Sequence, residues 1–366
     1  MAANNTAILI MAAGTGGHVF PALAIARKLS ERGIEIHWLA TESGMENRLL
    51  AGTGYELHKI SVKGLRGRGL VKMLLAPFMI IAATLQSLSV IHRVKPSCVL
   101  GMGGYIAGPG GLAAKLKGVP LVIHEQNAVA GLTNRLLAKF ANQVFEAFPA
   151  TFANRQKVVF SGNPVRAEII ALLARSKEKS LEKPLHLLVL GGSQGAAAIN
   201  SVVPLLLINW GESQRPYIWH QTGQAGLEET SGKYATAGIA LGENYRVDAF
   251  IDDMAAAYKW ADVVICRSGA STVSELAVVG LPAVFVPYPH HKDRQQTLNA
   301  EWLSHAGAAY IMQQAELSVE GITKILQRLN DNRTELSSMS AKGKAIAVKD
   351  ASDRIADYCL EVAANA

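Results

Sequence analysis

A histidine directly follows a glycine-rich turn near the start of the chain. The run "GTGGH", from Gly14 to His18, comes after the apolar stretch "AILIMAA" and before the helix-like sequence "VFPALAIARKL". Glycines between a strand and a helix leave backbone amides free to bind a phosphate, and the helix dipole favours the anion. The same dipole disfavours a protonated histidine and so leaves His18 able to accept a proton. The run therefore predicts an anion site beside a general base, with a histidine that caps or packs on the turn as the alternative.

Two more glycine turns follow apolar runs, in "CVLGMGGYIAGPGG" and in "HLLVLGGSQGAAAIN". One such turn is explained equally well by a tight strand-to-helix connection, but its recurrence favours diphosphate binding. The spacing does not fit the dinucleotide fingerprint G-x-G-x-x-G, because Val19 and Ser193 stand where glycines are needed. The lysine and hydroxyl of a P-loop are missing as well. A nicotinamide cofactor is therefore not predicted.

Metal and disulfide sites are not predicted either. "HEQNA", from His124 to Ala128, lacks the second histidine of a zinc-protease helix, and the pair His290 and His291 has no obvious third ligand. The three cysteines are scattered and odd in number, which favours a reducing cytosol. The first apolar run has no basic segment before it and ends in glycines, so we expect a first strand rather than a signal peptide.

Apolar strands alternate with helical stretches along the whole chain, which predicts an α/β protein with parallel sheets and helices on both faces. The strands expected are "AILIMAA", "EIHWLA", "CVLGMG", "PLVIHEQ", "HLLVLGG", "YIWHQT", "DVVICRS" and "PAVFVPY". The repeated strand–glycine–helix unit indicates two Rossmann-like domains with a ligand cleft between them. We expect domains at 1–163 and 164–348, with the turn "SGNPVR" as the crossing point. The last segment, 341–366, reads as helix, and about 349–366 is expected to pack back on the first domain.

Charge is distributed unevenly along the 366 residues. Residues 1–163 hold 17 Lys and Arg against 7 Glu, a balance of +10, whereas the remainder holds 19 basic and 22 acidic residues. The first half should therefore face an anionic partner. No recognised nucleic-acid-binding module is present, so phosphorylated substrates or an anionic lipid surface are favoured over nucleic acid.

Eight motifs in this order resemble one family. They are "GTGGHVFPALAIA", "GMGGYIAGPGG", "HEQNAVAGLTN", "GNPVR", "GGSQGA", "FIDDMAAAY", "RSGASTVSE" and "HKDRQQ", and they run from Gly14 to Gln296. The set is similar to the MurG family, the bacterial transferases that add N-acetylglucosamine from UDP-N-acetylglucosamine to lipid I, giving lipid II for peptidoglycan. The resemblance implies a GT-B fold, in which the first domain takes the lipid-linked acceptor and the second the UDP-sugar. A UDP-sugar epimerase or another UDP-sugar transferase of the same fold is the alternative.

The resemblance also implies site residues. Gly103, Gly104 and Tyr105 would hold the acceptor pyrophosphate, and Glu275 would accept hydrogen bonds from the ribose hydroxyls. Thr272-x-x-Glu275 also fits a helix capping box, which would give Glu275 a purely structural role. The residues implied to contact the donor are Thr15, Gly16, Gly17, Asn127, Arg166, Ser193, Ile251, Ala270, Ser271, Thr272, Val273, Ser274, Glu275, Gln295 and Gln296.

The implied reaction is an inverting displacement at the anomeric carbon, in which a base takes the proton of the attacking acceptor hydroxyl. His18 is the predicted base and Glu125 the second candidate. Helix amides can stabilise the leaving UDP, so no metal or other cofactor is expected. The family also implies a peripheral location on the cytoplasmic face of the bacterial inner membrane, with other cell-wall synthesis and division proteins as partners.

A long apolar segment between basic residues points to the membrane in its own right. Residues 73–91 carry no charge and are long enough to count as a transmembrane candidate. Their hydrophobicity is largely offset by one proline and several polar residues, and spanning would remove a crossover helix from the first domain. We therefore predict reversible binding to an anionic membrane surface through an outer apolar patch. The candidates for that patch are Leu74, Leu75, Phe78, Met79 and Ile81.

Overall fold

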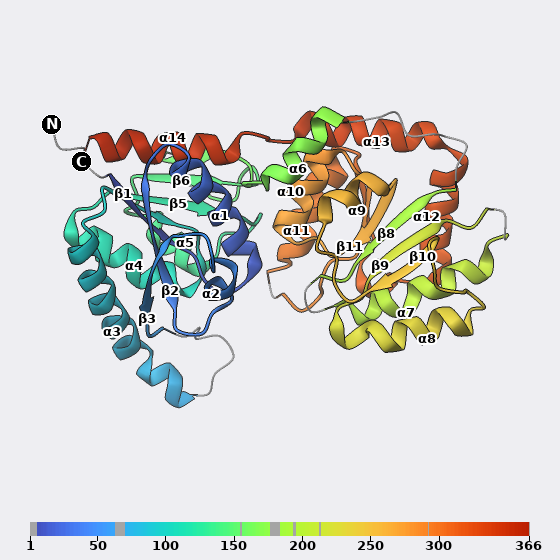
Figure 1. Cartoon of the computed structure of the whole chain (residues 1–366), viewed down its shortest axis with the longest axis horizontal. Helices are drawn as coiled ribbons and strands as arrows, with labels where there is room; N and C mark the ends of the chain where they lie inside the picture. Colours follow the sequence, from blue (N-terminus) through green and yellow to red (C-terminus); the bar gives the residue numbers. More distant parts are fainter. Residues whose placement is uncertain are drawn as a thin grey trace. The chain divides into compact units, whose positions relative to one another are not determined.

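The computed structural model describes residues 6–62, 70–153, 156–175, 184–192, 195–211, 214–291 and 293–365, with side chains at all of these except 70–74, 174, 175 and 209. The chain divides into two compact units (Figure 1). Unit 1 comprises Met1–Arg166 together with Val348–Ala366, and unit 2 comprises Ala167–Ala347. This division falls a few residues after the expected boundary at 163, and the chain leaves unit 2 at Ala347 to complete unit 1.

Unit 1 contains a parallel sheet of seven strands in the order β3-β2-β1-β4-β5-β6-β7. Its strands are β1 (Ala7–Met11), β2 (Glu35–Thr41), β3 (Glu56–Ile60), β4 (Cys98–Gly101), β5 (Leu121–Glu125), β6 (Gln143–Glu146) and β7 (Val158–Phe160). Its helices are α1 (Gly16–Ser30), α2 (Met45–Leu49), α3 (Leu70–Val94), α4 (Gly104–Lys117), α5 (Leu132–Leu137) and α14 (Ala351–Ala364).

Both faces of this sheet are buried, which is why its central strands read as continuous apolar runs. Ile8 and Ile10 of β1 pack into a core with α1 and α14, whereas Leu9 and Met11 pack into a second core with α3 and α4. Figure 1 shows these helices outside the strands. The predicted helix-covered parallel sheet is confirmed.

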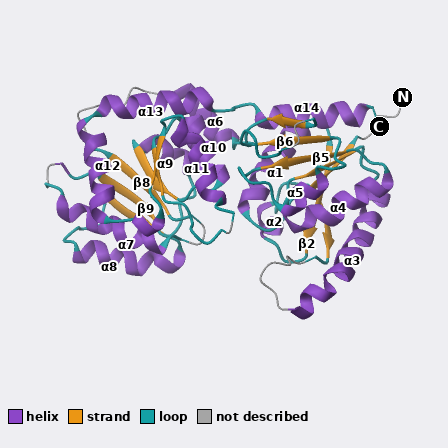
Figure 2. Ribbon diagram, turned by 180° about the vertical axis from the view of Figure 1, so that it is seen from behind, coloured by secondary structure: helices purple, strands orange, loops and turns teal. Residues whose placement is uncertain are grey.

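Unit 2 contains a parallel sheet of six strands in the order β10-β9-β8-β11-β12-β13 (Figure 2). Its strands are β8 (His186–Leu190), β9 (Tyr217–Gln221), β10 (Tyr245–Asp248), β11 (Val263–Cys266), β12 (Ala283–Phe285) and β13 (Ala309–Ile311). Its α-helices are α6 (Ala167–Ile170), α7 (Ala197–Leu206), α8 (Leu227–Thr236), α9 (Met254–Trp260), α10 (Ala270–Val279), α11 (Gln295–His305), α12 (Val319–Asp331) and α13 (Arg333–Ile346), and short 3₁₀ turns lie at Ala171–Arg175, Leu207–Asn209, Gln224–Gly226 and Gln314–Glu316.

The C-terminal segment differs from the expected single helix. α13 ends at Ile346, Ala347 is extended, and α14 begins only at Ala351. The break lies where the chain passes from unit 2 back to unit 1, and there Val348 lies against Gly162, so closely that a Cβ on this glycine would meet it at 2.5 Å. α14 then packs on α1 and β4. Tertiary packing therefore ends a helix that the local composition would have continued.

Candidate functional site

The first site lies at the carboxyl edge of the unit 1 sheet, between β1 and β4. These strands are neighbours in the sheet, and the strand order reverses at this point. The turn after β1 carries Gly14–Gly17 and leads into α1, while the turn after β4 carries Gly103 and leads into α4. Ligands of open α/β sheets bind at this kind of switch point. The structure therefore brings together two of the three glycine turns that the sequence singles out.

The glycines of these two turns adopt backbone conformations that other residues rarely take. Gly14, Gly103 and Gly104 have φ angles of 100°, 84° and 73°. A Cβ on Gly14 would lie 3.5 Å from Cε1 of Tyr105, and one on Gly103 would lie 3.4 Å from Cε1 of His18. The turns thus lie against each other, with the His18 ring beside Gly103. No side chain caps the start of α1 or of α4, so neither set of first-turn amides is blocked by a side-chain cap.

A hydrogen-bonded chain leads from the interior of unit 1 to His18. Nε2 of the buried His124 is 3.0 Å from the carbonyl oxygen of Gly162, which can only accept, so Nε2 carries the proton. Burial lowers the pKa of His124 to about 4, so its ring is neutral and its Nδ1 is an acceptor. Gln126 donates from its amide nitrogen to that Nδ1 at 3.0 Å. Its Oε1 must therefore face Nδ1 of His18, which lies 2.8 Å away.

This chain determines which nitrogen of His18 carries the proton. Because Oε1 of Gln126 only accepts, Nδ1 of His18 must donate to it. A neutral His18 ring then has no proton on Nε2, which is the nitrogen free to act as a base. Gln126 is 1% exposed and His124 is fully buried, so water does not compete for these hydrogen bonds. Neither residue is singled out by sequence reasoning, since the chain depends on contacts between distant segments.

Glu125, the second candidate base, is buried and used by its own loop. Its Oε1 accepts from the backbone and side-chain amides of Asn127 at 3.1 and 3.3 Å. Its Oε2 accepts from the backbone of Gly131 at 3.0 Å and from the side chain of Asn134 at 2.9 Å. A carboxylate that holds four donors stabilises the loop between β5 and α5. This geometry favours His18 over Glu125 as the candidate base. Asn127 lies half-buried in the same loop.

Two other buried carboxylates hold the same edge of the sheet. Glu46 accepts from the backbone amides of Thr41 and Gly14 at 2.8 and 3.3 Å, so it ties α2 to the first glycine turn. Glu146 accepts from the amides of Ala150 and Phe152 at 3.1 and 3.2 Å. Both glutamates are fully buried. Sequence reasoning missed them because a lone glutamate gives no local signal of burial.

The second site lies at the corresponding switch point of unit 2, between β8 and β11. Gly191 and Gly192 follow β8, and Gly269, which has no side chain to form a cap, is the N-cap of α10. Ser193, predicted in the turn after β8, lies outside the described residues. Ala270 and Ser274 are buried in α10, while Ser271 and Thr272 are half-buried at its start.

Two residues of α10 differ sharply in what they can offer a ligand. The hydroxyl of Ser271 is shielded from solvent and has no hydrogen-bond partner among the described residues. The amide of Val273 bonds to the carbonyl of Gly269, and its side chain is fully buried. Both groups of Val273 are thus used inside unit 2, because the helix has already begun at Ala270, and its contact with the donor stays a prediction.

Glu275 does not form a capping box. α10 begins at Ala270 with Gly269 as its N-cap, so Thr272 is inside the helix. Glu275 instead lies in the second turn, 7% exposed, and its Oε2 accepts from the hydroxyl of Tyr258 at 2.9 Å. The capping alternative for the Thr272–Glu275 pair is wrong. The carboxylate is held near the start of α10 by a tyrosine of α9.

Gln296 of the glutamine pair is held by the loops that precede α10 and α11. Gln295 and Gln296 are half-buried in the first turn of α11. Oε1 of Gln296 accepts from the amide of Tyr288 at 2.9 Å, and its carbonyl accepts from the hydroxyl of Ser268 at 2.8 Å. Ser268 directly precedes Gly269, so the two predicted donor-binding segments are joined. Ile251 is half-buried in the loop between β10 and α9.

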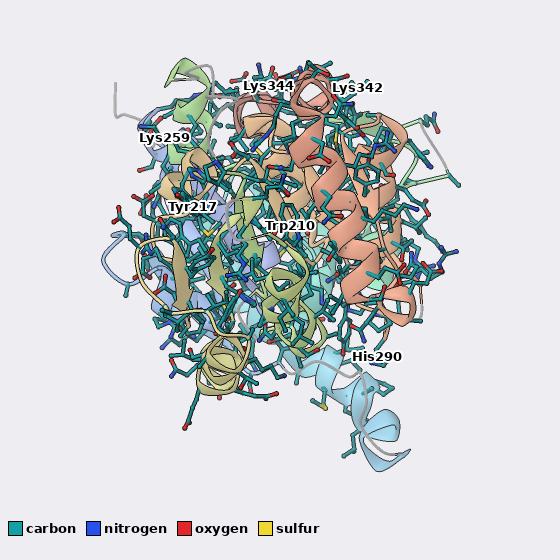
Figure 3. All side chains as sticks on the ribbon, turned by 90° about the vertical axis from the view of Figure 1, so that its right-hand side faces the viewer. Trp210, Tyr217, Lys259, His290, Lys342 and Lys344 are labelled. Carbon is teal, nitrogen blue, oxygen red and sulfur yellow. The ribbon has the colours of Figure 1, made fainter. Side chains whose placement is uncertain are left out.

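The remaining predicted positions are spread over unit 1 and the exposed loops. Thr15 and Gly17 are exposed and Gly16 is half-buried at the start of α1. Arg166 is half-buried at the end of the first part of unit 1, and its guanidinium lies 5.9 Å from the centre of the Phe20 ring. His290 is exposed on the loop after β12 (Figure 3). Among the described residues, His290 and His291 belong to no group of metal ligands.

Helix α3 presents apolar side chains on its outer surface. Leu75, Phe78, Ile81 and Leu85 are 49%, 69%, 56% and 61% exposed, whereas Met79 is half-buried. The side chain of Leu74 lies outside the described ones. On the inner side Ala83, Val90 and Ile91 are buried in the core with α4. Over the described residues, Leu75–Val94 is the one helical segment that meets the length and hydropathy needed to cross a membrane, and 28% of it is buried.

Comparison with known proteins agrees with this two-unit arrangement. The profile of the glycosyltransferase family 28 N-terminal domain matches residues 8–146, and that of the C-terminal domain matches residues 186–355. A transferase of Shewanella sp. strain ANA-3 is 49% identical over 97% of both chains, and its name is UDP-N-acetylglucosamine–N-acetylmuramyl-(pentapeptide) pyrophosphoryl-undecaprenol N-acetylglucosamine transferase. The crystal structure of Acinetobacter baumannii MurG is 41% identical, with a TM-score of 0.82 over 97% of this chain and 99% of that one.

The same fold occurs in enzymes with other activities. A UDP-GlcNAc 2-epimerase from Neisseria meningitidis, solved with UDP-GlcNAc, has a TM-score of 0.68 over 97% of this chain and 100% of that one, at 12% identity. That likeness concerns the fold alone.

The two Rossmann-like units, each with a glycine turn at its switch point, define a glycosyltransferase of the GT-B class. Within that class the chain belongs to the MurG family of N-acetylglucosamine transferases.

Proposed function

We propose that this protein transfers N-acetylglucosamine from UDP-N-acetylglucosamine to the muramyl sugar of pyrophosphoryl-undecaprenol-linked N-acetylmuramyl-pentapeptide, turning lipid I into lipid II. The proposal rests on the family to which the chain belongs and on relatives that share nearly half of its residues over almost the whole length. The single structural observation that supports it most is the 2.8 Å hydrogen bond between Nδ1 of His18 and Oε1 of Gln126, which leaves Nε2 of His18 as the ring nitrogen that can accept a proton beside the glycine turns of unit 1.

The donor is proposed to bind unit 2 at the start of α10. The Ser271 hydroxyl, which has no hydrogen-bond partner among the described residues, suits an oxygen atom of a diphosphate, and the helix dipole favours the charge of that group. Glu275 is available to accept from the ribose hydroxyls while Tyr258 fixes its carboxylate. Gln295 and Gln296 carry both donors and acceptors, which suits the hydroxyls of an uncharged sugar.

In unit 1, His18 is proposed to take the proton of the attacking acceptor hydroxyl. As the oxygen bonds to the anomeric carbon, the bond from that carbon to UDP breaks and the proton moves to Nε2. The Gln126 oxygen accepts from Nδ1–H throughout and stabilises the imidazolium that forms. The amides at Gly103–Tyr105 are proposed to hold the acceptor pyrophosphate next to this base. The leaving UDP is stabilised by helix amides, with no metal required.

A UDP-sugar epimerase is the alternative on the same fold. It would use a nucleotide site like that of unit 2, but it has no lipid-linked acceptor to bind. The exposed apolar row on α3 favours the transferase, because an acceptor that is anchored in a bilayer requires an enzyme at its surface. We infer that unit 1 binds the cytoplasmic face of the inner membrane peripherally through Leu75, Phe78, Ile81 and Leu85.

The test is turnover of UDP-N-acetylglucosamine with a soluble lipid I analogue. His18→Ala should lower kcat about a hundredfold or more and leave UDP affinity unchanged, since only base catalysis is lost. Gln126→Met keeps the side-chain volume but removes the acceptor for Nδ1–H of His18, so it should lower kcat as His18→Ala does. His305→Ala, an exposed histidine at the end of α11, is the matched control. Normal turnover by His18→Ala would exclude His18 as the base, and release of a 2-epimerised sugar would favour the epimerase.

A further inference from the structure

Two histidines and a glutamate meet in unit 1, outside the site described above. His37 lies on β2, and Glu56 and His58 lie on the neighbouring edge strand β3, with His37 paired to Glu56 in the sheet register. All three positions lie in the amino-terminal part of their strands, whereas the glycine turns follow the carboxyl ends. His37 and His58 are each 6% exposed, while the Glu56 side chain is 64% exposed.

The ligand atoms of these three residues lie close together, within 4.8 Å of one another. Nδ1 of His37 is 3.0 Å from Nε2 of His58. Each of these nitrogens faces one oxygen of the Glu56 carboxylate, Nδ1 of His37 at 3.4 Å from Oε2 and Nε2 of His58 at 3.7 Å from Oε1. A tetrahedral zinc ion with bonds of about 2.0–2.1 Å separates its ligand atoms by about 3.3 Å. Small side-chain shifts would therefore place one ion within bonding distance of both nitrogens and one oxygen of Glu56.

The carboxylate of Glu35 adds a contact on the other side of His37. It lies 3.3 Å from Nε2 of His37, whereas Nδ1 of the same ring faces Glu56. Glu35 would orient His37 from the second ring nitrogen, as carboxylates do for zinc-binding histidines.

From this geometry we infer that His37, Glu56 and His58 form a binding site for a divalent transition metal ion of the zinc type, with Glu35 supporting His37. Two imidazoles and one carboxylate favour zinc over calcium or magnesium, which prefer oxygen ligands. The exposed Glu56 gives the ion a path from solvent and leaves a fourth position for water. Because β3 is the edge strand of the sheet, an ion that joins it to β2 would stabilise this edge.

Cobalt provides the direct test, because tetrahedral Co²⁺ absorbs strongly in the visible region. The full-length protein, purified without a histidine tag and treated with chelator, is titrated with Co²⁺ and then with Zn²⁺. We expect one tetrahedral cobalt site, displaced by zinc, and an increase in Tm of a few degrees with zinc. Glu56→Gln, which changes an exposed side chain, should weaken cobalt binding at least tenfold, and His58→Gln should abolish the tetrahedral spectrum.

His92→Ala is the matched control, because His92 is an exposed histidine on α3 outside the cluster. Its cobalt affinity should equal that of the unmodified protein, and circular dichroism establishes that each variant is folded. The inference is overturned if the unmodified protein shows no tetrahedral band, or if Glu56→Gln and His58→Gln bind cobalt as the unmodified protein does. Transferase activity is not the readout, so failure of this inference is separate from failure of the proposed function.

Discussion

At the scale of single residues, the two units use their buried polar side chains differently. In unit 1 buried glutamates and the pair His124–Gln126 fix the loops and the ring around which acceptor chemistry is proposed. In unit 2 the buried carboxylate of Glu275, beside the donor segment, accepts a hydrogen bond from the Tyr258 hydroxyl near the start of α10. The identity of these residues is visible in the sequence, but their hydrogen-bond partners come from other strands and loops.

Glu275 gives a prediction about nucleotide recognition. Glu275→Ala should weaken UDP binding about 10- to 100-fold, because hydrogen bonds to a charged acceptor are worth roughly 1.5–3 kcal/mol. The loss should be much smaller for 2′-deoxy-UDP, which lacks one of the ribose hydroxyls. Calorimetric titration of both nucleotides measures this difference. Tyr258→Phe is the control that keeps the carboxylate, and equal losses for both nucleotides in Glu275→Ala would contradict ribose recognition.

Buried histidines give a prediction about pH. Burial lowers the pKa of His220 to about 3, and its ring nitrogens contact the Tyr234 hydroxyl and Oδ1 of Asn200 at 3.0 and 3.1 Å. The unfolded chain binds a proton near pH 6.5 that the folded chain does not bind. Stability is therefore complete above that pH and falls as the solution is acidified toward the folded pKa. Acidification from about pH 7 to about pH 5 should therefore lower the free energy of unfolding by about 2 kcal/mol through His220 alone.

Urea unfolding at about pH 7 and about pH 5 measures this effect. His220→Gln should be less stable at neutral pH but should lose less stability on acidification than the unmodified protein. His305→Gln, which changes an exposed histidine, should leave the pH dependence unchanged. If His220→Gln loses as much stability between about pH 7 and about pH 5 as the unmodified protein, the buried His220 is not the source of the loss. His124, whose pKa burial lowers to about 4, contributes with the same sign in unit 1.

At the scale of elements, α3 combines a face buried in the core with an exposed apolar face. Its later turns bury Ala83, Ser87 and Val90 in unit 1, while Leu75, Phe78, Ile81 and Leu85 remain exposed. A segment that packs in the core as a crossover helix is not free to span a bilayer. The structure therefore agrees with an apolar outer patch. Leu85, which was not predicted, is exposed in this patch, whereas the predicted Met79 is half-buried. The sequence could not assign these faces, because the helix is apolar on nearly all sides.

Vesicle flotation tests the proposed membrane contact. Leu75→Ser with Phe78→Ser should reduce binding to vesicles that contain anionic phospholipid, because two inserted apolar side chains are lost. Binding of the unmodified protein should also weaken at high salt, since basic residues contribute about 1 kcal/mol each near such a surface. Leu241→Ser, an exposed leucine of unit 2, is the control. If the double variant binds the vesicles as the unmodified protein does, and salt does not weaken binding, the membrane contact lies elsewhere.

The sequence predicts the central elements better than the edges. All eight strands expected from apolar runs are present, because both faces of these sheets are buried and their strands are strongly hydrophobic. The strands that it does not predict are short, and several lie toward the edges of the sheets: β3, β6, β7, β10 and β13. "ELHKI" of β3 is one of these, and it carries the two β3 residues of the inferred metal site. Strands this short contain too few residues to establish a periodic pattern.

Prediction of the site was limited in the same way. The three glycine turns and His18 are local patterns, and two of the turns meet at the β1–β4 switch point as parallel topology requires. The hydrogen-bonded chain through Gln126 and His124 depends on the carbonyl of Gly162, which no local pattern identifies. The meeting of His37 with His58 depends on strand register, which the sequence leaves open.

At the scale of the whole molecule, the chain builds unit 1 from both of its ends. Ile355, Ala356 and Cys359 of α14 are fully buried in the core that also contains Ile8, Ile10 and residues of α1. The neighbouring Cys98 of β4 and burial both raise the pKa of the Cys359 thiol. Unit 2, in contrast, is formed by one continuous stretch of chain. Unit 1 therefore depends on a segment that follows unit 2 in the sequence.

Ile355→Ala should destabilise unit 1 by about 2–5 kcal/mol, the usual cost of removing a buried aliphatic side chain and leaving a cavity. Hydrogen exchange resolves the effect by unit, because amides of β1 and α1 should exchange faster while those of β8 and β11 keep their rates. Arg354→Ala is the matched control, because its side chain is 48% exposed and pairs with Asp350 at the N-cap of the same helix, an i,i+4 contact worth about 0.3–0.5 kcal/mol. Equal acceleration in both sheets would mean that the two units unfold together, and no acceleration in β1 would mean that α14 adds little to the stability of unit 1.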